Sequence, residues 1–151
     1  MKYFLKGLIV VSLNILSLFG GSVPDAPGPK EGQSAPLFSA LDQNSQMINL
    51  SQFKNKSNVI LYFYPKDDTP GCTAQACNLR DNIGAIKAMD AVILGVSADD
   101  VASHQEFAEK YQLPFSLLAD PNKELINKYG VAMPLVGIAK RWTFIIGKDG
   151  V

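Results

Sequence analysis

YFYPKDDTPGCTAQAC, residues 62–77, holds both cysteines of the chain and passes through three kinds of local structure. The apolar run at 59–63, which leads into it, predicts a buried strand. The prolines and the glycine that follow predict a loop. From Cys72 to about residue 88 there is no proline and apolar residues recur at helical spacing, which predicts a helix. A strand, a loop and a helix in this order indicate an α/β unit.

Strands and helices alternate along the rest of the sequence. Apolar, β-rich runs predict further strands at 91–97, 115–118 and 142–146. Asp99 or Asp100 can cap one helix between them. Asp120 followed by Pro121 marks the start of another helix, and Gly130 marks its end. This alternation predicts an α/β sheet that is covered on its faces by helices.

The end of the sequence predicts an unpaired strand edge. Residues 147–150 are a turn signal after the strand at 142–146, and the sequence stops at Val151 before a partner strand. An apolar edge without a partner is prone to association. We therefore expect either a fragment or an edge that another chain completes.

Composition and charge limit the partners. The chain has 151 residues, which suit one domain with a sizeable core. Basic and acidic residues are equal in number, 14 each. A chain without net charge or a charged tail does not attract nucleic acid or an anionic membrane surface. We expect small molecules or other proteins as partners.

The first 22 residues have the layout of a secretory signal. Lys2 and Lys6 precede an apolar run at 8–19, and small residues follow at 20–22. The run is shorter than the ~20 residues that span a bilayer, so we expect a signal peptide at 1–22, with a membrane anchor as the alternative. Residues 23–31 are rich in proline and glycine and predict a linker to a domain at 32–151. The expected location is then the periplasm or another extracytoplasmic space.

Cys72 lies where a reactive thiolate is expected. It begins the predicted helix, and the positive field of a helix N-terminus stabilises a thiolate, the nucleophilic form of cysteine. Gly71 lets the backbone approach a small substrate, and the backbone N–H groups of Gly71 and Cys72 can hold a developing negative charge. Thr69 offers a hydroxyl to the same pocket, and Pro65 stiffens the loop.

Cys77 follows five positions later, which raises the question of a disulfide. In a helix, the Cα atoms of two such residues lie roughly 8–9 Å apart, beyond the ~7 Å that a disulfide spans. A bond between them would unwind the helix. The spacing favours a bridge that forms and breaks during turnover, with a static bridge as the alternative.

A metal site fits the sequence poorly. Zinc needs four ligands, and beyond the two cysteines the chain offers one histidine, His104. His104 lies in a polar segment, SHQEFAEK, where we expect it to be solvated. The C-x-x-C motif of dithiol–disulfide exchange enzymes is absent.

The loop Pro65-x-x-x-Thr69-x-x-Cys72 resembles the active-site signature of the peroxiredoxins. The longer string YPKDDTPGCTAQACNLRDN at 64–82 resembles their peroxiredoxin Q branch, also called bacterioferritin comigratory protein. Supporting matches are GQSAPLF at 32–38, VILGVS at 92–97 and RWTFII at 141–146. The resemblance runs from about residue 31 to residue 151.

This resemblance implies a thioredoxin-like fold, a central β-sheet flanked by helices, whose last strand and helix would follow Val151. It implies a peroxidase that works through cysteine and needs no metal, haem or flavin cofactor. Cys72 would be the peroxidatic cysteine and Cys77 the resolving cysteine. The other pocket residues would be Thr69, Pro65 and Arg141, the last of which is a permanent cation that favours the thiolate.

The implied partners are a peroxide, either hydrogen peroxide or an organic hydroperoxide, and thioredoxin or a similar dithiol reductant. The branch implies a monomer, with a weak dimer as the alternative. The competing hypothesis is an exported, thioredoxin-like binding or scaffold protein with a static disulfide.

Overall fold

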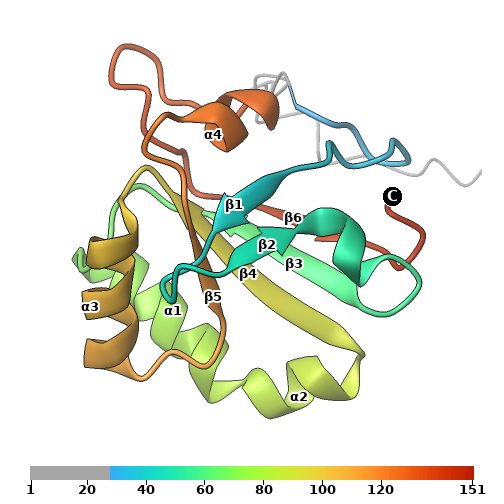
Figure 1. The fold of residues 1–151 in the computed structure, drawn as a ribbon, viewed down its shortest axis with the longest axis horizontal. Coiled ribbons are helices and arrows are strands. Elements are labelled where there is room, and N and C mark those ends of the chain that lie inside the picture. The colour runs from blue at the N-terminus through green and yellow to red at the C-terminus, as the bar shows by residue number, and fades with distance from the viewer. Residues whose placement is uncertain (1–27) are drawn as a thin grey trace, which may run out of the picture.

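The computed structural model describes residues 28–151, which form a four-stranded sheet with a small hairpin beside it (Figure 1). The strand order is β5–β4–β3–β6. The strands are β3 (Asn58–Phe63), β4 (Ala91–Ser97), β5 (Ser116–Ala119) and β6 (Trp142–Ile146). β3, β4 and β5 run parallel, and β6 runs antiparallel to β3. The sheet confirms the four predicted strands and the α/β class.

Four helices accompany the sheet: α1 (Pro70–Asp81), α2 (Ile83–Ala88), α3 (Val101–Tyr111) and α4 (Glu124–Lys128). The hairpin consists of β1 (Ser39–Leu41) and β2 (Met47–Asn49), and the short 3₁₀ helix η2 (Leu50–Phe53) follows it. The sequence did not predict this hairpin. The cap of α3 was predicted correctly, because the Asp100 side chain accepts a hydrogen bond from the backbone N–H of Ser103.

Two helix predictions need correction. The helix expected from Cys72 to residue 88 is two helices, α1 and α2, separated at Asn82. The Asn82 side chain donates to the carbonyl of Asn78 at 2.9 Å, so a local side-chain bond competes with the helical pattern there. The last helix, α4, begins at Glu124 and not at Pro121, because Asp120 first forms a turn. The Asp120 carboxylate then accepts from the N–H of Ile126 at 2.9 Å.

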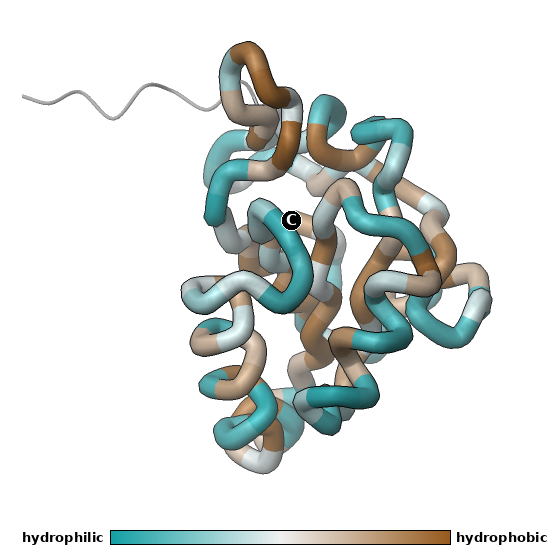
Figure 2. Tube along the Cα trace, turned by 90° about the vertical axis from the view of Figure 1, so that its left-hand side faces the viewer, coloured by the Kyte–Doolittle hydropathy of each residue, from teal (hydrophilic) through white to brown (hydrophobic). Residues whose placement is uncertain are grey.

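Each face of the sheet has its own hydrophobic core, because successive strand residues point to opposite faces. Leu61 and Phe63 of β3 lie in the core that includes residues of β1 and α4. Tyr62 lies in the core that includes residues of α1, α2 and α3. Figure 2 shows the hydrophobic strands in the interior and hydrophilic turns around them. The sheet is therefore covered on both faces, as the sequence predicted.

The carboxyl ends of β3 and β4 lie side by side and place two loops next to each other. β3 pairs with β4 in register up to Phe63 and Val96. The loop after β3 leads to α1, and the loop after β4 leads to α3. The backbone N–H of Asp67 in the first loop donates to the Asp99 carboxylate in the second at 2.9 Å. In open α/β sheets, ligand sites form at this end of the strands.

Candidate active site

Cys72 lies in the first turn of α1, and its side chain is buried. Thr69 is the N-cap of the helix and Pro70 occupies its first position, where a proline does not disrupt the helix. The first N–H groups of a helix have no partner within it, so they carry positive partial charge toward the N-terminus. The structure thus places the sulfur of Cys72 where the sequence predicted, in a field that favours a thiolate.

Arg141 contacts this sulfur from the other end of the chain. Its Nη2 lies 3.3 Å from the Sγ of Cys72, and its Nη1 donates to the side-chain oxygen of Gln75 on the next turn of α1. The guanidinium therefore bridges two side chains of one helix. A permanent cation in contact with the sulfur stabilises its negative charge.

The pairing of β6 with β3 brings Arg141 to the site. The two strands run antiparallel, and Phe63 at the end of β3 pairs with Trp142 at the start of β6. Arg141 precedes Trp142, so it lies at the same end of the sheet as the loop that leads to Cys72. No local sequence pattern marks this arginine; the resemblance alone identified it.

The remaining predicted residues have specific places in the loop. Pro65 and Thr69 are half-buried, and the Thr69 hydroxyl donates to the carbonyl of Lys66 at 2.9 Å. The hydroxyl proton therefore ties the loop together, and the oxygen retains lone pairs for a ligand. A Cβ at Gly71 would lie 3.1 Å from Nη2 of Arg141, so the glycine leaves room for the guanidinium.

Cys77 lies on the same helix as Cys72, and both are free thiols. Helix α1 is continuous from Pro70 to Asp81, so the two sulfurs are held on one rigid element. Five residues of helix separate them by about 7.5 Å along the axis. Bringing the sulfurs together therefore needs the first turns of α1 to unwind.

Tyr62, which the sequence analysis did not select, adjoins the site with an unsatisfied hydroxyl. It is buried in the same core as Cys72, and its OH has no hydrogen-bond partner among the described residues. Burial, with smaller contributions from Asp67 and Cys72, raises the pKa of Tyr62 far above its usual value. The hydroxyl therefore stays protonated.

His104 is buried and not solvated, which corrects the sequence prediction. Its Nδ1 lies 2.7 Å from Oδ2 of Asp67, in the loop between β3 and α1, and its Nε2 lies 3.0 Å from the carbonyl oxygen of Leu118. His104 shares the inner face of α3 with Phe107 and Ala108, which are also buried. Its position at helical spacing from these apolar residues was the signal that could have predicted its burial.

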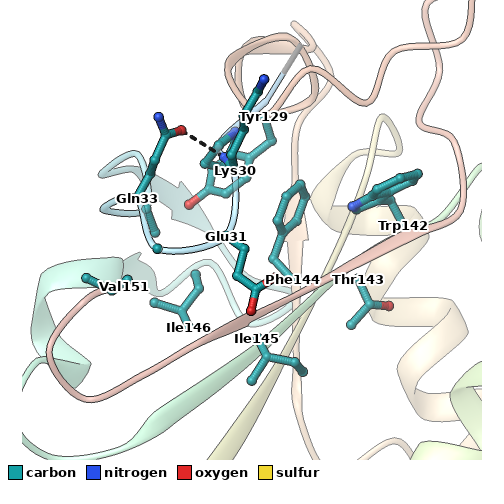
Figure 3. Close-up of a pocket in the computed structure, with 13 residues that line it drawn as sticks. Lys30, Glu31, Gln33, Tyr129, Trp142, Thr143, Phe144, Ile145, Ile146 and Val151 are labelled. Atoms are coloured by element: carbon teal, nitrogen blue, oxygen red, sulfur yellow. Dashed lines mark hydrogen bonds between the residues drawn. The ribbon is translucent and has the colours of Figure 1, made fainter. Parts of the chain in front are cut away.

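A groove of about 700 Å³ lies apart from these residues, along β6 (Figure 3). Its walls include Trp142, Phe144 and Ile146 on one side and the segment around Lys30 on the other. None of the predicted site residues lines it. Within the part of the chain that the structure describes, no three potential metal ligands lie together.

The chemistry that the arrangement of Cys72, Arg141 and the start of α1 supports is nucleophilic attack by Cys72.

Comparison with protein families matches residues 32–151 to the AhpC/TSA family. A rice (Oryza sativa subsp. japonica) protein named Peroxiredoxin Q, chloroplastic, is 44% identical over 122 residues, which are 80% of this chain and 56% of the rice protein. A Coxiella burnetii protein named as a peroxiredoxin bcp is 43% identical over 126 residues, which are 80% of this chain and 83% of that protein. The chain thus spans just over half the length of the plant relatives that it matches.

Two solved structures are also similar. Peroxidoxin BcpB from Mycobacterium tuberculosis has a TM-score of 0.74 and 34% identity, covering 79% of each chain. A cysteine-to-serine mutant of Xylella fastidiosa PrxQ has a TM-score of 0.70 and 30% identity, covering 75% of this chain and 73% of that one.

These relatives contradict the expected export to an extracytoplasmic space, because the plant proteins are named chloroplastic. The signal peptide or anchor expected at 1–22 lies outside the described residues. Between residues 28 and 151, no helix is long and apolar enough to cross a membrane.

Proposed function

The chain belongs to the AhpC/TSA family, in its peroxiredoxin Q and bcp branch, and we propose that it is a thiol-dependent peroxidase for hydrogen peroxide and organic hydroperoxides. The comparisons confirm the resemblance seen in the sequence, and the solved relatives confirm the thioredoxin-like α/β fold. The observation that carries the proposal is the contact between Arg141 and Cys72, 3.3 Å long, at the N-terminus of α1.

The proposed reaction begins at the sulfur of Cys72. The thiolate attacks one oxygen of the peroxide, the O–O bond breaks, and the second oxygen takes up a proton from the solvent and leaves as water or an alcohol. Cys72 becomes a sulfenic acid. The leaving oxygen develops negative charge, which the Arg141 guanidinium and the first N–H groups of α1 are placed to stabilise. Thr69 and Pro65 shape the pocket from the loop side.

We propose that Cys77 resolves the sulfenic acid. Its thiolate attacks the Sγ of Cys72, the S–O bond breaks, water leaves, and an intramolecular disulfide forms. The first turns of α1 must unwind for this step, because the helix separates the sulfurs. A thioredoxin-like protein with two thiols then reduces the disulfide by exchange and restores both cysteines.

The test is peroxide consumption by the full chain with thioredoxin, thioredoxin reductase and NADPH. The unsubstituted protein is expected to consume peroxide through many turnovers, and Cys72→Ser is expected to consume none above background. A scaffold with a static disulfide would show no free thiols before peroxide and no change after it. Turnover that survives in Cys72→Ser would contradict the proposal.

A further inference from the structure

His104 forms a buried contact that the proposed reaction does not use. It is a fully buried side chain of α3, with 0% of its surface exposed. Its two ring nitrogens meet two oxygens: Nδ1 lies 2.7 Å from Oδ2 of Asp67, and Nε2 lies 3.0 Å from the carbonyl oxygen of Leu118. Asp67 is also buried, at 7% exposure.

The hydrogen-bond partners define where the protons lie. A backbone carbonyl can only accept, so Nε2 carries a hydrogen that it donates to Leu118. Asp67 accepts from the Tyr64 hydroxyl at 2.6 Å and from the Ser103 hydroxyl at 2.8 Å. The Asp67 carboxyl group is therefore hydrogen-bonded to the side chains of Tyr64, Ser103 and His104 in one network.

Two further side chains adjoin the pair, those of Tyr64 and Asp99. Burial, with smaller effects of Tyr62 and Asp67, raises the pKa of Tyr64 well above its usual value. The Tyr64 hydroxyl therefore remains a donor, and its oxygen lies 3.5 Å from Nδ1 of His104. The Asp99 carboxylate also lies beside the pair, where it accepts from the backbone N–H of Asp67 and from the Ser97 hydroxyl.

The pair joins α3 to the loop in front of Cys72. Asp67 is the middle residue of the segment from Pro65 to Thr69. Its neighbour Asp68 also contacts α3, through Lys110 at 2.7 Å and the Tyr111 hydroxyl at 2.6 Å, but this contact is exposed and screened by solvent. The hydrogen bonds from Lys110 and Tyr111 lower the pKa of Asp68. The contact of His104 with Asp67 is shielded from water, because both side chains are buried.

We propose that His104 is a positioning residue, whose buried hydrogen bond with Asp67 fixes the loop 65–69 against Cys72. The inference rests on the proposed peroxidase function. Removing one partner leaves a buried polar group without its hydrogen bond, which the loop relieves by moving. A displacement of about 1 Å at a reacting centre can slow a reaction by about 100-fold.

The first test measures the reaction of Cys72 with hydrogen peroxide in the Cys77→Ser background. His104→Gln and Asp67→Asn are expected to slow it by about 10- to 100-fold each, at temperatures where circular dichroism shows the variants folded. The double variant is expected to be no slower than the slower single variant, because both remove the same pair. Gln105→Ala, on the exposed side of α3, is the control and is expected to keep the rate.

A second readout separates positioning from a general loss of structure. Alkylation of Cys72 by iodoacetamide does not need an oriented peroxide, so it is not expected to slow in His104→Gln. Slower alkylation would show that His104 acts on the sulfur itself and would overturn the proposal. A folded His104→Gln protein with the unsubstituted rate would overturn it as well.

¹⁵N NMR spectra of the backbone amides give a test that needs no activity. The amide signals of Asp67, Asp68 and Thr69 are expected to shift in His104→Gln and to stay in Gln105→Ala. Unshifted loop signals would refute the inference whether or not the protein reduces peroxide. Failure of peroxide reduction in the unsubstituted protein would refute the proposed function instead.

Discussion

Arg141 reaches the Sγ of Cys72 with Nη2 at 3.3 Å while its Nη1 holds the side chain of Gln75. The guanidinium is planar, so the second hydrogen bond fixes the direction of the first. The helix that carries Cys72 therefore also fixes, through Gln75, the position of the guanidinium at the sulfur. Lysine has a single nitrogen and cannot hold both side chains in this geometry.

Substitution of Arg141 is expected to slow the reaction of Cys72 with peroxide while leaving the fold intact. We expect Arg141→Met to lose about 100-fold, as for removal of one donor to a developing negative charge, and Arg141→Lys to keep part of the rate. Trp142, the only tryptophan of the chain, follows Arg141 and offers a fluorescence signal for stopped-flow measurement. Lys140→Met removes the neighbouring cation and serves as the control. An Arg141→Met protein as fast as the unsubstituted one would contradict the assigned role.

Substitution of Cys77 is expected to separate the two halves of the cycle. We expect Cys77→Ser to consume one equivalent of peroxide at the normal rate and then to stop, because thioredoxin has no disulfide to reduce. Since the chain has two cysteines, a thiol count before and after peroxide follows Cys72 alone in this variant. Sustained turnover of Cys77→Ser with thioredoxin would show that Cys77 is not the resolving cysteine.

Two glycines are expected to respond to alanine with opposite signs. Gly95 of β4 lies between Tyr62 and Leu117 on the neighbouring strands, and a Cβ there would come within 2.8 Å of both side chains. Because both neighbours are buried, Gly95→Ala is expected to lower the free energy of unfolding by about 1–3 kcal/mol.

Gly84 is the matched case. It lies on the exposed side of α2, and a Cβ there would meet no atom within 4 Å among the described residues. Gly84→Ala is expected to raise the free energy of unfolding by about 0.5–1 kcal/mol, because alanine favours the helix. Urea unfolding of both variants measures the two changes in the free energy of unfolding. Changes of the same sign and size in the two variants would refute the packing argument.

Asp120 is expected to make stability depend on pH. Burial raises the pKa of Asp120, although the N–H groups of Ile126, Leu125 and Glu124 oppose this effect. A carboxyl whose pKa is higher in the folded state stabilises the fold most below its unfolded pKa of about 3.9, and this contribution is lost as the pH rises through the folded value.

Asp120→Asn does not titrate at this position. Its melting temperature relative to the unsubstituted protein is therefore expected to increase as the pH is raised from about 3 to about 6. Glu106→Gln, at an exposed position of α3, is the control for loss of one carboxylate. A relative melting temperature that stays constant or falls over this range would contradict the raised pKa.

Local patterns predicted the strands and the place of Cys72, because runs of apolar residues and a helix start depend on neighbouring residues. Arg141 could not be found in this way, since its contact depends on the antiparallel register of β6 on β3. The break at Asn82 comes from one side-chain bond that helical periodicity does not register.

The burial of His104 could have been predicted from the sequence, but the sequence analysis predicted a solvated side chain. The polar residues around it predicted a solvated helix, whereas His104, Phe107 and Ala108 recur at helical spacing and form the inner face of α3. No sequence pattern could predict the hydrogen-bond partner of His104. Asp67 lies 37 residues away, on the loop that follows a different strand.

Cys72, in contact with Arg141 at the start of α1, is proposed to be the nucleophile that attacks the peroxide. The direct measurement is the rate at which the reduced Cys77→Ser protein gains one oxygen atom from hydrogen peroxide, followed by mass spectrometry between about pH 5.5 and pH 8.5. We expect a rate far above that of free cysteine throughout this pH range. A rate that matches that of free cysteine would contradict the role of Cys72 as the attacking nucleophile.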